Sequence, residues 1–152
     1  MTKQKYCRCL WFISCLGVVM FIFANSLMTA EESGAESASW LSRLLSFFPF
    51  LTHNLLRKLA HFSEYALLGA HLAFLPLLFP FSMKVSGPLA LVAGASVAFL
   101  DEGIQLFVPG RAGLFTDVLI DLAGFLFGGC LFVLLIFLYA KRKEKKTRAS
   151  QT

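Results

Sequence analysis

Ten ionisable side chains lie inside or beside segments that are otherwise apolar enough to cross a membrane. They are Arg57, Lys58, His61, Glu64, Tyr65, His71, Asp101, Glu102, Asp117 and Asp121. A charge in the hydrocarbon layer of a bilayer is costly unless it faces a protein interior or a water-filled cavity. Imidazole and carboxyl groups can transfer protons, and guanidinium groups bind phosphate, so the set indicates a functional site.

Four apolar segments must position these groups, and they cover residues 10–28, 54–80, 88–108 and 117–139. At a rise of 1.5 Å per residue, each can cross a hydrocarbon core of about 30 Å. The chain of 152 residues is 57% hydrophobic and 15% charged, which excludes an ordinary soluble domain. We therefore expect an all-α membrane protein, with a single domain over residues 1–152 built as a four-transmembrane-helix bundle.

Basic residues predict the orientation of this bundle. Of the 14 Lys and Arg residues, all but four lie in the N-terminal head, in the loop 81–87 or in the basic tail 141–152. The four are Arg43, Arg57, Lys58 and Arg111. The positive-inside rule then places both termini in the cytoplasm. The net charge of +5 therefore indicates topology and contact with anionic membrane lipids, with no nucleic-acid partner. A signal peptide cleaved near Ala30 is the alternative to a first span.

The segment 30–52 is the one sizeable loop on the outer side. Residues 31–34 are expected to be polar coil, and the apolar residues from Trp40 to Phe48 recur at helical spacing. This pattern predicts a short interfacial helix, with Trp40 at headgroup depth and Pro49 after its end. The alternative is a hydrophobic loop packed over the bundle, and both interpretations make the segment a cap over the outer face.

Antiparallel spans bring distant polar groups to one depth. Counted from the outer end of each span, His61, Asp101 and Asp121 lie about 8–10 Å deep. One stripe of the second span holds residues at steps of four and three. They are Arg57, His61, Glu64, Leu68 and His71, with Lys58 and Tyr65 beside them.

Small residues share faces with the acidic groups. In the fourth span, Gly124 and Gly128 form a G-x-x-x-G surface on the face of Asp117 and Asp121, which lets helices approach closely. The polar faces are therefore expected to point inward.

Acidic groups outnumber basic ones in this layer. A surplus of carboxylates implies protonated carboxyl groups, a bound cation, or a cationic or hydroxyl-rich ligand. The alternative is that the charges only pair, for example Arg57 with Glu64 or Lys58 with Asp101, and hold the bundle together.

Three other features have structural interpretations. His71 is expected to form a hydrogen bond between helices, and His53 is expected to be an interfacial residue. Asn25 and Ser26 either lean into the polar layer or cap the first span. The four cysteines lack the paired spacing of a zinc site and suggest no disulfide.

Several runs occur in matching order along the chain. They are 57–65 followed by Gly69, 101–105, Pro109, Arg111, 117–118 and Gly124, with 21–26 at the end of the first span. Together they resemble the VanZ-like family of small bacterial membrane proteins, over roughly residues 10–135. Glu102 and Gln105 match the family's E-x-x-Q, whereas Asp121 stands where many relatives have Asn. The resemblance implies a multi-pass protein of the bacterial cytoplasmic membrane; the founding member is associated with low-level resistance to teicoplanin.

The first functional hypothesis is a site in the outer half of the bilayer that binds or acts on a cell-envelope lipid or glycan intermediate, with an effect on teicoplanin susceptibility. Its candidate acids and bases are His61, Glu64, Asp101 and Glu102. Its candidate binding residues are Arg57, Lys58, Tyr65, Gln105, Arg111, Asp117 and Asp121. A divalent cation could be held by Asp117, Asp121 and Glu102. Whether the protein is an enzyme stays open.

Two other classes of function compete with this hypothesis. One is a structural or partner-binding membrane subunit whose buried charges lock the bundle. The other is a proton-coupled transporter or accessory that uses His61, Glu64 and Asp101 as a relay.

Overall fold

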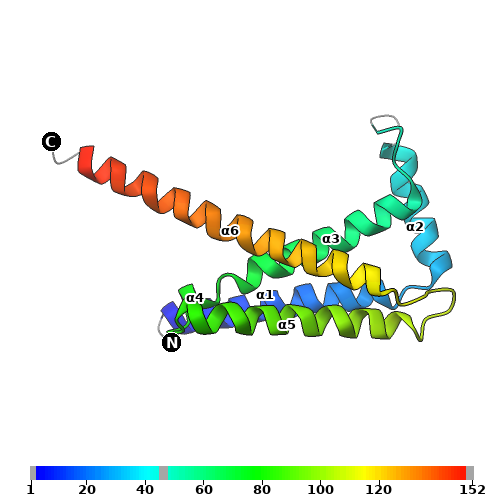
Figure 1. Cartoon of the computed structure of the whole chain (residues 1–152), viewed down its shortest axis with the longest axis horizontal. Coiled ribbons are helices and arrows are strands. Elements are labelled where there is room, and N and C mark those ends of the chain that lie inside the picture. The colour runs from blue at the N-terminus through cyan, green and yellow to red at the C-terminus, as the bar shows by residue number, and fades with distance from the viewer. Residues whose placement is uncertain (1–2, 45–47, 150–152) are drawn as a thin grey trace.

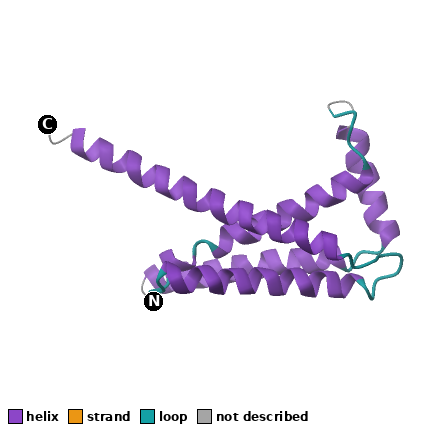
Figure 2. Ribbon diagram, in the orientation of Figure 1, coloured by secondary structure: helices purple, strands orange, loops and turns teal. Residues whose placement is uncertain are grey.

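The computed structural model describes residues 3–44 and 48–149, and every regular element within them is a helix (Figures 1 and 2). The helices are α1 (Lys3–Ser26), α2 (Ala30–Leu44), α3 (His53–Leu72), α4 (Leu75–Leu78), α5 (Met83–Gln105) and α6 (Phe115–Ala149). Three of them, α1, α5 and α6, are long and apolar enough to cross a membrane. The all-α expectation is confirmed, and these three helices fit a membrane protein.

The helices form two pairs (Figure 1). α1 and α5 lie side by side, while α6 crosses α3 and its C-terminal part projects away from the other helices. The buried core lies between them, with Ile22, Tyr65, Leu68 and Ala98 almost fully enclosed. Many large apolar side chains elsewhere on the described helices are exposed, which is typical of a surface that faces lipid.

Glycine brings α3 and α6 into backbone contact. A Cβ atom at Gly124 would lie 2.3 Å from the Phe62 carbonyl oxygen, and one at Gly128 would lie 1.8 Å from that of Ala66. Both distances are shorter than any real Cβ contact, so only glycine permits this crossing. The predicted G-x-x-x-G contact surface is confirmed.

The predicted second span, 54–80, consists of two helices. Thr52 caps α3, because its Oγ1 accepts a hydrogen bond of 3.2 Å from the Leu55 amide. The helix ends at Leu72 because the ring of Pro76 would clash with the carbonyl group four residues earlier. After this break, α4 adds a single turn.

Three other helices are longer than the sequence predicts, and the first of them, α1, begins at Lys3 instead of residue 10. α5 begins at Met83 instead of residue 88, so most of the predicted loop 81–87 is helical and Pro88 stands inside the helix. A proline this close to the N-terminus removes only one backbone hydrogen bond, so the helix can start earlier. α6 continues from the predicted span into the basic tail as far as Ala149, and the last tail residues lie outside the described part of the chain.

The outer segment also starts differently from the prediction. Residues 31–34 are helical and not coil, because Thr29 and Glu32 form a capping box at the start of α2. The Glu32 amide donates to Thr29 Oγ1 at 3.2 Å, and the Glu32 carboxylate accepts from the Thr29 amide at 2.8 Å. The predicted interfacial helix falls partly on residues 45–47, outside the described residues, and its place at the membrane surface stays a prediction.

Candidate functional site

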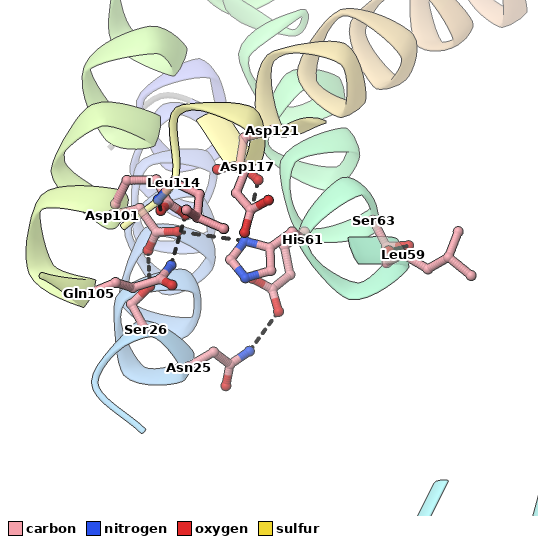
Figure 3. Close-up of polar contacts among 12 residues, drawn as sticks. Asn25, Ser26, Leu59, His61, Ser63, Asp101, Gln105, Leu114, Asp117 and Asp121 are labelled. Carbon is pink, nitrogen blue, oxygen red and sulfur yellow. Dashed lines mark hydrogen bonds and ion pairs between the residues drawn. The ribbon is translucent and has the colours of Figure 1, made fainter. Parts of the chain in front are cut away.

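The polar groups of α3, α5 and α6 meet at one end of the bundle, as predicted (Figure 3). Four side chains each offer a ligand atom, and these atoms all lie within 4.8 Å of one another. We call them the His–carboxylate cluster, which consists of His61, Asp101, Glu102 and Asp121. Depth and helical phase, which were counted from the sequence, therefore placed these groups correctly.

His61 lies between two aspartates at the centre of the cluster. Its Nδ1 is 3.3 Å from Asp121 Oδ1 and 3.9 Å from Asp101 Oδ2. Both aspartates are completely buried, and His61 is only 9% exposed. The atoms face one another without hydrogen-bond alignment, so His61 Nδ1, Asp101 Oδ2 and both Asp121 oxygens have no hydrogen-bond partner.

α1 supplies hydrogen-bond donors to the site. Ser26 Oγ donates to Asp101 Oδ1, and Asn25 Nδ2 donates to Glu64 Oε1 at 2.7 Å (Figure 3). Of the two interpretations of Asn25 and Ser26, the structure shows the one in which they lean into the polar layer. Neither was among the predicted site residues, although both end the motif at residues 21–26.

Glu102 connects the cluster to the loop that follows α5. Its Oε2 accepts a hydrogen bond of 2.8 Å from the Leu114 amide, and its Oε1 accepts one of 3.0 Å from Gln105 Nε2. Gln105 Nε2 also lies 3.4 Å from Ser26 Oγ. These bonds orient the Glu102 carboxylate and hold the start of α6 against the end of α5.

A pocket of about 320 Å³ opens beside the cluster, between α1, α2 and α3. Its polar wall includes Arg57, Arg111, Glu64 and His61. Its apolar wall includes Phe21, Met28, Trp40 and Leu56. Glu36 also lines the pocket, so two arginines and two glutamates lie beside its hydrophobic side, and His61 belongs to both the pocket and the cluster.

Arg111 lies in the pocket close enough to Arg57 to be affected by its charge. Burial, and after it the charge of Arg57, lower the pKa of Arg111 below its ordinary value. The Arg111 guanidinium also donates a hydrogen bond of 3.2 Å from Nη2 to the Asn25 backbone carbonyl. Guanidinium groups stay protonated in proteins, so two positive charges lie close together in a pocket that is also lined by Glu36 and Glu64.

Four predicted site residues lie outside both the cluster and the pocket, and one of them, Gln105, still bonds to Glu102 of the cluster. Asp117 is buried one turn before Asp121, with Thr116 Oγ1 at 3.4 Å from its Oδ1, and is not part of the cluster. Lys58 is half-buried and does not line the pocket. Tyr65 is fully buried in the core, and its hydroxyl group has no hydrogen-bond partner.

The simple pairings that the sequence suggested are wrong. Between the described side chains, no ion pair joins Arg57 to Glu64 or Lys58 to Asp101. The pairs that form instead connect His61 to aspartates on two other helices. Arg57 is directed to the pocket, where α2 forms the opposite wall.

Sequence reasoning missed that α2 is part of the pocket. Trp40 lines the pocket, and the Arg43 guanidinium lies 5.7 Å from the centre of its indole ring. The signal that could have revealed this wall is the T-x-x-E pattern at Thr29, which starts α2 beside the end of α1.

His71 forms the predicted hydrogen bond between helices at the other end of α3. Its Nε2 lies 2.9 Å from Ser14 Oγ, and its backbone carbonyl accepts a hydrogen bond of 2.9 Å from Trp11 Nε1. His71 therefore joins α3 to α1, well away from the cluster.

Comparison with models of protein families gives a match. The model of the family described as VanZ/LLP1 matches residues 11–138, which is most of the chain and includes every residue of the His–carboxylate cluster. No curated protein and no solved structure matches the chain.

Proposed function

Because the chain belongs to the VanZ/LLP1 family, we propose that it is a multi-pass protein of the bacterial cytoplasmic membrane that binds a phosphorylated cell-envelope lipid or lipid-linked glycan at its outer face. The carrying observation is the pocket between α1, α2 and α3. It combines two arginines and two glutamates with an apolar wall and opens onto His61. A lipid phosphate has the matching chemistry, with an anionic headgroup and an apolar chain.

Each part of the pocket has a role in this proposal. Arg57 and Arg111 bind the phosphate, since guanidinium groups form paired, charge-assisted hydrogen bonds with its oxygens. Trp40 and Phe21 contact the first part of the lipid chain. His61 and Glu64 lie at the headgroup, where they are candidates for acid and base in a reaction or for hydrogen bonds to a bound glycan.

The proposed topology has four spans, with α3 as the span that carries the polar stripe. Its charged residues make it less apolar than α1, α5 and α6, but Arg57, His61 and Glu64 face the pocket. Backbone contact with α6 through Gly124 and Gly128 supports a place inside the bundle. The basic residues then put both termini in the cytoplasm and the pocket in the outer half of the bilayer.

Lipid binding to the purified full chain tests this proposal. The probe is a polyprenyl phosphate, compared with the uncharged polyprenol of the same length and with phosphatidylglycerol. We expect the phosphate to bind best. Arg57→Gln should weaken this binding about tenfold to a hundredfold, because a hydrogen bond to a charged group contributes about 1.5–3 kcal/mol.

The neighbouring Lys58 provides the matched control. Lys58→Gln removes the same charge one residue away from a side chain that does not line the pocket, and should change affinity less than about twofold. Equal binding of phosphate and polyprenol, or equal losses in the two variants, would contradict the proposal.

The effect on glycopeptides is tested in cells. Expression in a glycopeptide-sensitive Gram-positive host should lower teicoplanin susceptibility, and Arg57→Gln at the same membrane level should abolish the change. Unchanged susceptibility with good expression would show that this chain does not confer teicoplanin resistance. Lipid binding is tested separately, by the assay with the purified chain.

A structural subunit is the second candidate, and the bonds that cross between helices favour it. Two hydrogen bonds hold the ends of α1 and α5 and the start of α6 together. One joins Ser26 to Asp101, and the other joins the Leu114 amide to Glu102. In that case Glu64→Gln should lower the amount of folded protein. With a binding site, the protein level stays normal and ligand binding changes.

A further inference from the structure

We propose that the His–carboxylate cluster binds one divalent transition-metal ion. The cluster differs from the set predicted from the sequence, because His61 and Asp101 belong to it and Asp117 does not. The proposal concerns the cluster itself and does not depend on the identity of the lipid ligand.

The distances in the cluster suit a metal ion. One atom from each of the four side chains lies within 4.8 Å of all the others. Zinc binds imidazole nitrogen and carboxylate oxygen at about 2.0–2.2 Å in a tetrahedron, so its ligand atoms are about 3.4 Å apart. Separations in the cluster would therefore shorten by up to about 1.4 Å when all four atoms bind one ion.

The unpartnered atoms point to the same conclusion. Asp121 is fully buried, and neither of its carboxylate oxygens has a hydrogen-bond partner. Asp101 Oδ2 and His61 Nδ1 also lack a hydrogen bond, and His61 Nδ1 lies 3.9 Å from Asp101 Oδ2 and 3.3 Å from Asp121 Oδ1. Buried polar atoms in proteins nearly always have hydrogen-bond partners, and four such atoms in one cluster indicate a ligand between them.

Hydrogen bonds from neighbouring groups orient the carboxylates of the cluster, as is common for metal ligands. Ser26 fixes Asp101 through its Oδ1 and leaves Oδ2 directed at His61, while Glu102 is held by the Leu114 amide and Gln105. Metal ligands are commonly oriented by such outer hydrogen bonds. The bonds hold the ligands in place and leave lone pairs free for an ion.

The charges of the cluster also favour a bound metal ion, because His61 alone cannot neutralise the three carboxylates. Three carboxylates meet a single imidazole, and even a protonated His61 would leave an excess of negative charge in a buried place. Arg111 donates to the Asn25 carbonyl instead, and no ion pair between a carboxylate of the cluster and an arginine or lysine occurs in the described part of the chain. A divalent cation supplies the missing positive charge.

The ligand types define the class of ion. Three oxygen donors with one imidazole nitrogen suit Mn²⁺, Fe²⁺ or Zn²⁺, whereas Ca²⁺ prefers a shell of oxygens alone. With His61 shared by cluster and pocket, the ion would lie next to the anionic headgroup that we propose for the pocket.

Metal content of the purified full chain tests the proposal. The protein, with Cys7 and Cys9 changed to Ser, is treated with a chelator, then titrated with Zn²⁺, Mn²⁺ and Ca²⁺ and analysed by elemental mass spectrometry. We expect one equivalent of Zn²⁺ or Mn²⁺ per chain, at least tenfold tighter than Ca²⁺, and a higher unfolding temperature when the ion is bound. A folded wild-type protein with no stoichiometric ion and no thermal shift would overturn the proposal.

Three variants locate the ion. Asp121→Asn and His61→Gln should each weaken binding at least tenfold, and Asp117→Asn, one turn away on the same helix, should keep it. Retained binding in both cluster variants would overturn the proposal, as would loss in Asp117→Asn alone. The lipid assay is run on the chelated protein as well, so that failure of metal binding and failure of lipid binding are seen separately.

Discussion

Gly128 of α6 packs directly on the backbone of Ala66 in α3. A Cβ atom at Gly128 would lie 1.8 Å from the Ala66 carbonyl oxygen, whereas one at the neighbouring Gly129 would find its nearest atom at 3.5 Å. The first distance is impossible without moving a helix, and the second is an ordinary contact. The same helix pair carries His61 and Asp121, so this contact also sets the geometry of the cluster.

Gly128→Ala should therefore destabilise the bundle, and Gly129→Ala should not. We expect the first substitution to cost at least about 1–3 kcal/mol, the usual range for an overpacked interior, because backbone atoms cannot yield as a side chain would. Thermal unfolding in detergent measures both variants. Equal unfolding temperatures would show that the two helices separate easily at this crossing.

Ser26→Ala should destabilise the fold more than Ser63→Ala does. Ser26 donates a hydrogen bond to a fully buried oxygen of Asp101, while exposed Ser63 only bonds back to the Leu59 carbonyl in its own helix. A buried acceptor without its donor costs about 1–3 kcal/mol. Chemical unfolding of both variants gives the comparison, and a larger loss for Ser63→Ala would contradict it.

The start of α2 should loosen in acid. Hydrogen bonds from the Thr29 amide and hydroxyl lower the pKa of Glu32 below its ordinary value of 4.5. A depressed carboxyl pKa in the folded state stabilises the helix above the unfolded value, and this contribution is lost as pH falls through the folded pKa. Hydrogen exchange of residues 29–44, corrected for the intrinsic effect of pH, should show faster opening below about pH 4.5.

Two neighbouring substitutions isolate this effect. Glu32→Gln should remove the pH dependence, and Glu31→Gln should keep it, since both glutamates lie in the first turn but only Glu32 closes the capping box. The same pH dependence in both variants would assign the loosening to other groups.

Fusion proteins test the proposed topology. A fluorescent protein attached after the basic tail should fluoresce, because both termini are expected in the cytoplasm. Alkaline phosphatase fused after Ser42 in α2 should be active, since that helix is expected on the outer side. The reverse pattern would place the pocket at the cytoplasmic face.

The sequence predicted the polar layer well because helical geometry is regular. A repeat of 3.6 residues puts Arg57, His61 and Glu64 on one stripe, and a rise of 1.5 Å puts His61, Asp101 and Asp121 at one depth. The stripe agrees with the pocket, which Arg57, His61 and Glu64 line, and the common depth agrees with the cluster. The predicted boundaries of the helices were less accurate. The start of α5 was predicted too late, at Pro88, and the first turn of α2 was predicted as coil, because the capping box at Thr29 was not recognised.

The sequence by itself determined that apolar helices carry acids, an imidazole and arginines at a common level, because composition and periodicity are local properties. Only the tertiary structure decided which groups meet. Asp117 and Asp121 share one face of α6, yet His61 meets Asp121, because the Gly124 and Gly128 contacts fix where α6 crosses α3. Partner choice depends on how two helices are rotated and shifted against each other, and a shift of one turn would exchange one aspartate for the other.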